Sequence, residues 1–112
     1  MIVDRVRRVR EALGVEVSYS VKANPNLGVC QLIARERQAG AEVASAGELV
    51  VVRAAGFPPE DIVFAGPGKT DEELRRAVEE GIFAVNVESL NEIGRLAEIA
   101  KWEGRRVGVG LR

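Results

Sequence analysis

The chain of 112 residues is 46% hydrophobic, and its 16 basic and 17 acidic side chains leave a net charge of −1. The basic residues are spread along the chain instead of forming a patch, so nucleic acid is not expected as a partner. One cysteine and no histidine exclude an internal disulfide, a Cys/His zinc site and a Ser-His or Cys-His catalytic pair within this chain, and indicate a reducing cytoplasm.

The predicted elements begin with a helix and continue as alternating strands and helices. The opening stretch "MIVDRVRRVREALG" has the apolar spacing of an amphipathic helix and does not read as a signal peptide. No apolar run approaches the ~20 residues needed to span a bilayer, so no membrane is expected. Strands are predicted at 16–21, 41–45, 61–65, 83–87 and 107–111. The helices between them are predicted at 27–38, 46–55, 71–80 and 90–103.

Local motifs mark the ends of these helices. A glycine follows each predicted helix end, where a left-handed C-cap favours it: Gly40, Gly56, Gly81 and Gly104. Three helix starts match the S/T-x-x-E capping box, at Ser45–Glu48, Thr70–Glu73 and Ser89–Glu92. Asn26 can cap the remaining helix. Strand, short turn and helix in strict alternation predict a parallel sheet with right-handed crossovers.

Strand parity distinguishes a doubly wound sheet from part of a (β/α)₈ barrel. In the first strand Val17, Tyr19 and Val21 share one face, and Ser18, Ser20 and Lys22 share the other. Later strands likewise have one aliphatic face and one small or polar face, although the third is too uniformly apolar to orient. A doubly wound sheet needs aliphatic residues on both faces, whereas a barrel needs them only toward its helices. We therefore predict an α/β fold, a partial TIM barrel of about five parallel strands.

Lys22 lies at the predicted C-terminal end of the first strand, on the small and polar face. In a barrel this is a position at the mouth, where active sites lie. One interpretation is an ordinary lysine with a packed stem and a solvated amine. The other is an amine held in a low-dielectric pocket, where burial can lower a lysine pKa by about 3 to 5 units and yield a neutral nucleophile for Schiff-base chemistry.

Four segments, "YSVKANPN", "GAEVASAGEL", "FAGPGKTDEEL" and "VNVES", occur in order along the chain. With them the chain resembles the pyridoxal-phosphate-dependent decarboxylases of the alanine-racemase-like fold, the group containing diaminopimelate, ornithine and arginine decarboxylases. The resemblance runs from about Val3 to Arg112, and it is specific because four blocks match in register. It implies a (β/α)₈ barrel followed by a β domain. We expect residues 1–112 to be the N-terminal part of that barrel, with its remainder and the β domain beyond Arg112.

The resemblance also implies site residues. Lys22 corresponds to the lysine that forms the Schiff base with pyridoxal 5′-phosphate. Glu42, Glu48 and Arg112 correspond to cofactor-binding positions, although many relatives have aspartate in place of Glu42. Glu48 is equally explained by its capping box, and Arg112 as an ordinary terminal residue. Weaker candidates are Asn24, Ser45 and Asn86.

The activity implied by the resemblance is decarboxylation of a small-molecule amino acid, with meso-diaminopimelate as the expected substrate and lysine as the product, in lysine biosynthesis. The pyridine-nitrogen partner, the phosphate loop and a cysteine-bearing segment from a second subunit are not in this chain. We therefore expect a cytoplasmic homodimer in full-length form, and no activity from these residues alone. Alternatives are ornithine, arginine or a carrier-bound amino acid as substrate, or a non-catalytic barrel that binds pyridoxal phosphate.

The segment "GPGKT" at 66–70 resembles the end of a phosphate-binding P-loop. That motif requires a glycine five residues before Gly68, and the chain has Val63 there. Lys69 is accordingly predicted to be a solvated charge in a turn.

Overall fold

The computed structural model describes residues 2–14, 17–23, 26–36 and 39–111. Its helices are α1 (Ile2–Leu13), α2 (Leu27–Glu36), α3 (Ala46–Ala55), α4 (Asp71–Glu80) and α5 (Leu90–Glu103). Its strands are β1 (Ser18–Ser20), β2 (Gly40–Val43), β3 (Ile62–Phe64), β4 (Ala84–Val87) and β5 (Val109–Leu111). Short 3-10 helices, η1 (Val21–Ala23) and η2 (Pro59–Asp61), follow β1 and precede β3. None of the described helices is long and apolar enough to cross a membrane.

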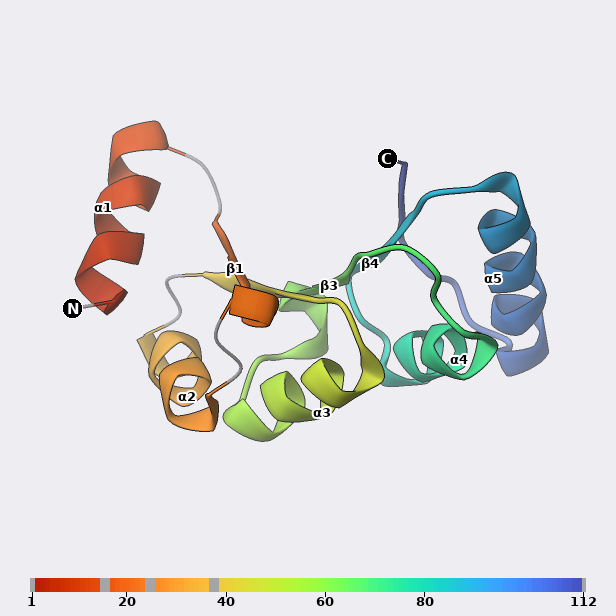
Figure 1. The fold of residues 1–112 in the computed structure, drawn as a ribbon, viewed down its shortest axis with the longest axis horizontal. Coiled ribbons are helices and arrows are strands. Elements are labelled where there is room, and N and C mark those ends of the chain that lie inside the picture. The colour runs from red at the N-terminus through yellow and green to blue at the C-terminus, as the bar shows by residue number, and fades with distance from the viewer. Residues whose placement is uncertain (1, 15–16, 24–25, 37–38, 112) are drawn as a thin grey trace.

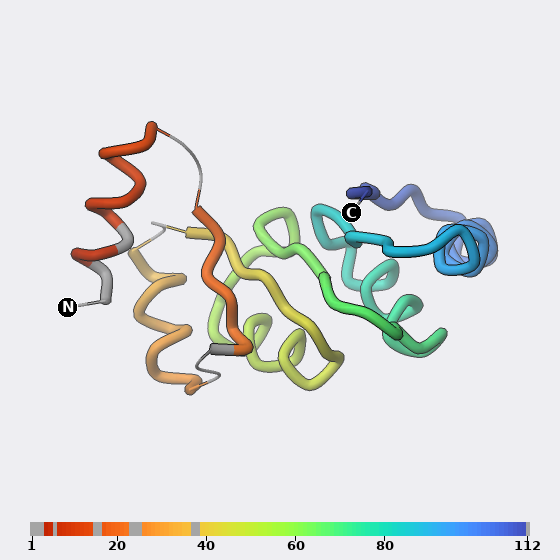
Figure 2. Tube along the Cα trace, turned by 45° about the horizontal axis from the view of Figure 1, so that its top comes forward, coloured from red at the N-terminus to blue at the C-terminus, as the bar shows by residue number. Residues whose placement is uncertain are grey.

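The five strands form one parallel sheet in the order β1-β2-β3-β4-β5, so every strand pairs with its neighbour in the chain. A doubly wound sheet would reverse its strand order at a switch point, and this sheet does not. The helices α2, α3 and α4 lie together on one side of the sheet (Figures 1 and 2). The prediction of a partial barrel is therefore confirmed, with the barrel left open in this chain.

The hydrophobic core fills the layer between the sheet and the helices. Val43, Phe64 and Val87 are buried there together with side chains spaced three or four residues apart on the helices, such as Leu74 and Val78 of α4. The third strand, which the sequence left unoriented, turns Ile62 and Phe64 into this core and leaves the intervening Val63 half-buried. The opposite face of the sheet carries small and polar residues such as Ser20 and Glu42, with Val63 as an apolar exception.

The helix bounds agree more closely with the predictions than the strand bounds do. Helices α3, α4 and α5 have the predicted bounds, and Gly56, Gly81 and Gly104 follow them in the left-handed conformation. Predicted residues 16, 37 and 38 lie outside the described part. The predicted C-cap Gly40 is wrong, because Gly40 is the first residue of β2. A Cβ atom there would lie 2.5 Å from the backbone oxygen of Asp61, which explains the glycine.

Candidate functional site

A cleft of about 480 Å³ lies at the carboxyl ends of the strands. Its lining comes from the ends of β1 and β2, from η1, from the residues that follow β2 and β3, and from the residue after β4. The lining residues are Ser20, Lys22, Glu42, Val43, Ala44, Ala65, Gly66, Pro67 and Glu88. Because the carboxyl edge of a barrel sheet is where its catalytic residues gather, this cleft is the candidate site.

Three charged side chains meet at this cleft, one ammonium and two carboxylates. Lys22 belongs to η1, the turn that directly follows β1. The strand was predicted to run to Val21, but it ends at Ser20, two residues before Lys22. Glu42 is half-buried on β2, in register with Ser20 of β1. Glu88 follows β4 and was not predicted as a site residue, although it lies two residues after Asn86 and so continues the polar alternation of that strand.

The side chain of Lys22 is exposed in the described part of the chain. The low-dielectric pocket considered for Lys22 is therefore not formed by these residues alone. The adjoining positions Ala44, Ala65 and Gly66 are small and leave open space beside the lysine. The cleft thus combines a primary amine with lining residues that have a small side chain or none.

Glu48 does not line this cleft, and only half of the capping box predicted at Ser45–Glu48 forms, because the Glu48 carboxylate accepts from the backbone N–H of Ala44 instead of that of the N-cap Ser45. Its backbone N–H donates to Ser45 Oγ at 3.1 Å, and its Oε1 accepts from the backbone N–H of Ala44 at 3.1 Å. Since Ala44 lines the cleft, Glu48 holds one edge of the cleft through the backbone. The predicted residues Asn24 and Arg112 lie outside the described part of the chain.

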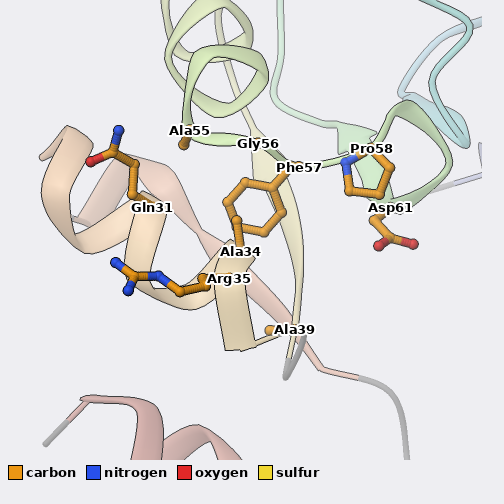
Figure 3. Close-up of a pocket in the computed structure, with 9 residues that line it drawn as sticks. All are labelled: Gln31, Ala34, Arg35, Ala39, Ala55, Gly56, Phe57, Pro58 and Asp61. Atoms are coloured by element: carbon orange, nitrogen blue, oxygen red, sulfur yellow. The ribbon is translucent and has the colours of Figure 1, made fainter.

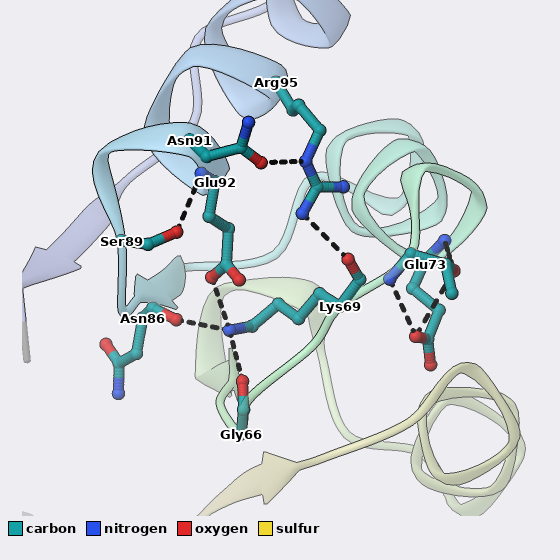
Figure 4. A network of polar contacts seen from close by, with 9 residues as sticks. Gly66, Lys69, Glu73, Asn86, Ser89, Asn91, Glu92 and Arg95 are labelled. Carbon is teal, nitrogen blue, oxygen red and sulfur yellow. Dashed lines mark hydrogen bonds and ion pairs between the residues drawn. The ribbon is translucent and has the colours of Figure 1, made fainter.

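Lys69 was predicted to be solvated, and that prediction is wrong. Its side chain is 1% exposed and donates to Gly66 O at 2.6 Å, Asn86 O at 2.6 Å and Glu92 Oε1 at 2.8 Å (Figure 4). The capping box predicted at Ser89–Glu92 is accordingly only half correct. Ser89 Oγ accepts from the N–H of Glu92 at 3.0 Å, while the Glu92 carboxylate pairs with Lys69.

A second cavity, of about 540 Å³, lies at the opposite end of the sheet between α2 and α3 (Figure 3). Ala39 and Asp61, which line it, directly precede β2 and β3, so it belongs to the amino edge. Its other polar side chains are Gln31 and Arg35. Conserved chemistry in barrels of this kind is carried by the carboxyl edge, so this cavity is not the candidate site.

Cys30 is fully buried on α2, as expected of a small core residue. Burial raises the pKa of its thiol above the ordinary value. Burial likewise raises the pKa of Tyr19, and the nearby Cys30 adds to that effect. A buried thiol held in its neutral form is a poor nucleophile, so the packing role is the one that the structure supports.

Comparisons with known proteins agree on one group. A family model described as the pyridoxal binding domain of pyridoxal-dependent decarboxylases matches residues 1–112. A diaminopimelate decarboxylase of Zymomonas mobilis is 44% identical over 99% of this chain and 28% of that protein. An L-glutamyl-[acyl-carrier protein] decarboxylase of Niallia circulans is 41% identical over 96% of this chain and 25% of that protein.

Solved structures agree with the sequence relatives. The crystal structure of diaminopimelate decarboxylase from Helicobacter pylori complexed with L-lysine aligns with a TM-score of 0.87 and 30% identity, over 98% of this chain and 29% of that one. The chain therefore spans less than a third of the length of each of these relatives.

Proposed function

The chain belongs to the pyridoxal-dependent decarboxylases, and from this membership we propose that the whole protein decarboxylates an amino acid with pyridoxal phosphate held at Lys22. The observation that carries the proposal is the meeting of Lys22, Glu42 and Glu88 at one cleft on the carboxyl edge of a partial barrel. Bound pyridoxal phosphate supplies an electron sink for the electron pair that the departing CO₂ leaves behind.

The residues of the cleft fit the aldehyde end of this cofactor. Lys22 is the primary amine at the cleft, and a primary amine is the group that holds an aldehyde covalently. The small side chains of Ala44 and Ala65 leave room beside it for a flat ring. Because the amine must be neutral to act as a nucleophile, and Lys22 is exposed here, we propose that further parts of the protein cover it and exclude water.

Of the two glutamates predicted from the resemblance, Glu42 and Glu48, only the first is proposed to contact the cofactor directly. Glu42 is half-buried on β2 and lines the same cleft as Lys22, so we assign it to the cofactor. Glu48 supports the cofactor site indirectly, by holding the backbone of Ala44. A cofactor contact by Arg112 stays a prediction from the family resemblance. When Lys22 is released from the cofactor, its amine can hold or move a proton at the same end of the cleft.

For the substrate we propose meso-diaminopimelate, which would give L-lysine. The support is the similarity to diaminopimelate decarboxylases at 44% identity, and the H. pylori relative crystallised with L-lysine. A carrier-bound amino acid is the second candidate, since the relative acting on a glutamyl carrier protein is 41% identical. We also propose a homodimer, from the resemblance alone, and a cytoplasmic location, which the single reduced thiol of Cys30 supports.

The test is an activity assay on the full-length protein. Incubated with pyridoxal phosphate and meso-diaminopimelate, it should release CO₂ and produce L-lysine, detected by mass spectrometry. Lys22→Ala should lower kcat/KM by about 10³-fold or more, because the covalent attachment is lost. Lys101→Ala, which changes an exposed lysine on α5, is the matched control and should retain activity. Cofactor binding without decarboxylation of any amino acid would favour a non-catalytic barrel.

A further inference from the structure

The segment "GPGKT" follows β3, and two of its residues, Gly66 and Pro67, line the Lys22 cleft. Gly66 has a backbone φ of 104°, a conformation that residues other than glycine rarely adopt. The backbone therefore turns sharply at the edge of the cleft. In Figure 4 the side chain of Lys69 extends to a point between Gly66, Asn86 and Glu92.

All three donors of the Lys69 ammonium are used within the protein. One closes the turn at Gly66 O, one reaches Asn86 O in β4, and one pairs with Glu92 Oε1 in the first turn of α5. An ammonium with no remaining donor cannot bind a phosphate ligand, so the P-loop interpretation fails on geometry as well as on sequence. The side chain instead connects three segments of backbone.

Burial makes this connection rigid. The side chains of Lys69 and Glu92 are 1% and 4% exposed, and no buried side-chain nitrogen or oxygen in the described part of the chain lacks a partner. A buried ion pair is tolerated only with good geometry and further hydrogen bonds, and removing one partner leaves an uncompensated charge in the interior. The three connected segments therefore have one favoured arrangement.

A second set of contacts supports the same loop from outside. Arg95 of α5 donates to Lys69 O at 3.1 Å and pairs with Asp71 of α4 at 2.7 Å. On the other side of the loop, Glu73 Oε2 accepts from the backbone N–H of Ala46 at the start of α3 at 3.0 Å. The loop between β3 and α4, together with the first turn of α4, is thus connected to α5 on one side and to the start of α3 on the other.

We propose that Lys69, paired with Glu92, is a positioning residue that fixes the two edges of the Lys22 cleft. One edge is Gly66 and Pro67, and the other is Glu88, which lies between Asn86 and the start of α5. This inference rests on the proposed function, because the cleft positioned in this way is the cofactor cleft. Lys69 acts through the backbone of the lining residues and does not itself line the cleft.

The test measures cofactor affinity in the full-length protein. Lys69→Met removes the ammonium that connects the two edges of the cleft. The dissociation constant of pyridoxal phosphate, measured by absorbance titration, should therefore rise about tenfold or more. The kcat/KM for the proposed substrate should fall on the order of 100-fold, as expected when a catalytic geometry shifts by about 1 Å. Glu92→Gln keeps the side-chain size but removes the counter-charge, and it should change both quantities in the same direction.

Two controls separate positioning from general stability. Leu96→Ala removes a buried core side chain of α5 and should lower the thermal midpoint without raising the cofactor dissociation constant by more than about twofold. Arg53→Met breaks the ion pair between Arg53 and Glu80, which joins the far ends of α3 and α4, and should leave cofactor affinity unchanged.

The outcomes distinguish this inference from the proposed function. Unchanged cofactor affinity in Lys69→Met would overturn the positioning role, as would an equal loss of affinity in Leu96→Ala. If Lys69→Met does not fold, Glu92→Gln decides, and unchanged affinity there would also overturn it. A parent protein that binds no pyridoxal phosphate would instead overturn the proposed function, and this inference with it.

Discussion

Gly40 shows how closely the strands approach one another at single residues. Its backbone N–H donates to Val17 O at 2.8 Å, and its missing side chain makes room for the backbone oxygen of Asp61. Because the neighbour is backbone and not a flexible side chain, an added methyl group cannot be accommodated by a rotamer change. The glycine is therefore a packing requirement of the β1–β2–β3 ladder.

Gly40→Ala should destabilise the full-length protein by about 1 to 3 kcal/mol, the usual range for overpacking a close contact. The measurement is the free energy of unfolding in urea. Gly94→Ala is the matched control, because nothing lies within 4 Å of a Cβ atom at that position on α5. There the higher helix propensity of alanine should stabilise by up to about 1 kcal/mol. Equal stability of Gly40→Ala and the parent would contradict the account.

Lys22 and Lys69 show where residue-level prediction succeeds and where it fails. Strand parity predicted Lys22 on the polar face at the mouth. The structure places it in η1, after the end of β1, where it lines the cleft at the carboxyl edge and is exposed. Lys69 was predicted to be solvated because its sequence neighbours are turn residues. Its acceptors Asn86 and Glu92 lie 17 and 23 residues further along the chain, and local patterns carry no information about such partners.

At the scale of helices and strands, the sequence predicted the ends of an element correctly where the hydrogen bonds of its motif form within the same segment. The start of α4 is a complete capping box between Thr70 and Glu73, and Gly81 ends the helix in the left-handed conformation. The strands were harder to delimit, because their ends are decided by pairing with neighbours. Residues 107 and 108 were predicted as strand, yet β5 begins at Val109, where its pairing with β4 begins.

Glu73 connects two helices and should matter more than its neighbour. Its Oε1 accepts from the N–H of Thr70 at 3.1 Å and its Oε2 from the N–H of Ala46 at 3.0 Å. Glu73→Ala should cost about 1 to 2 kcal/mol in the free energy of unfolding. Glu72→Ala is the control, because Glu72 shares the favourable position near the helix N-terminus but is exposed. The two variants should differ, and equal losses would show that the hydrogen bonds of Glu73 contribute nothing.

At the scale of the whole molecule, the strand order and the placement of the helices leave one face of the sheet without helices (Figure 1). Parity predicted this arrangement from the sequence, since a one-sided aliphatic pattern needs only one layer of helices. Large apolar side chains remain exposed, among them Phe83 at 64% and Leu111 at 82%. These side chains and the exposed amine of Lys22 lie in a chain that spans less than a third of the length of its relatives.

The central claim is that the amine of Lys22 holds the aldehyde of pyridoxal phosphate, and it can be measured directly. The full-length protein is incubated with the cofactor, reduced with borohydride and digested, and its peptides are analysed by mass spectrometry. The account predicts a phosphopyridoxyl group on Lys22, and its loss in Lys22→Arg, because the arginine guanidinium stays protonated and does not react in this way. A label confined to other lysines of the parent protein, with Lys22 unmodified, would contradict it.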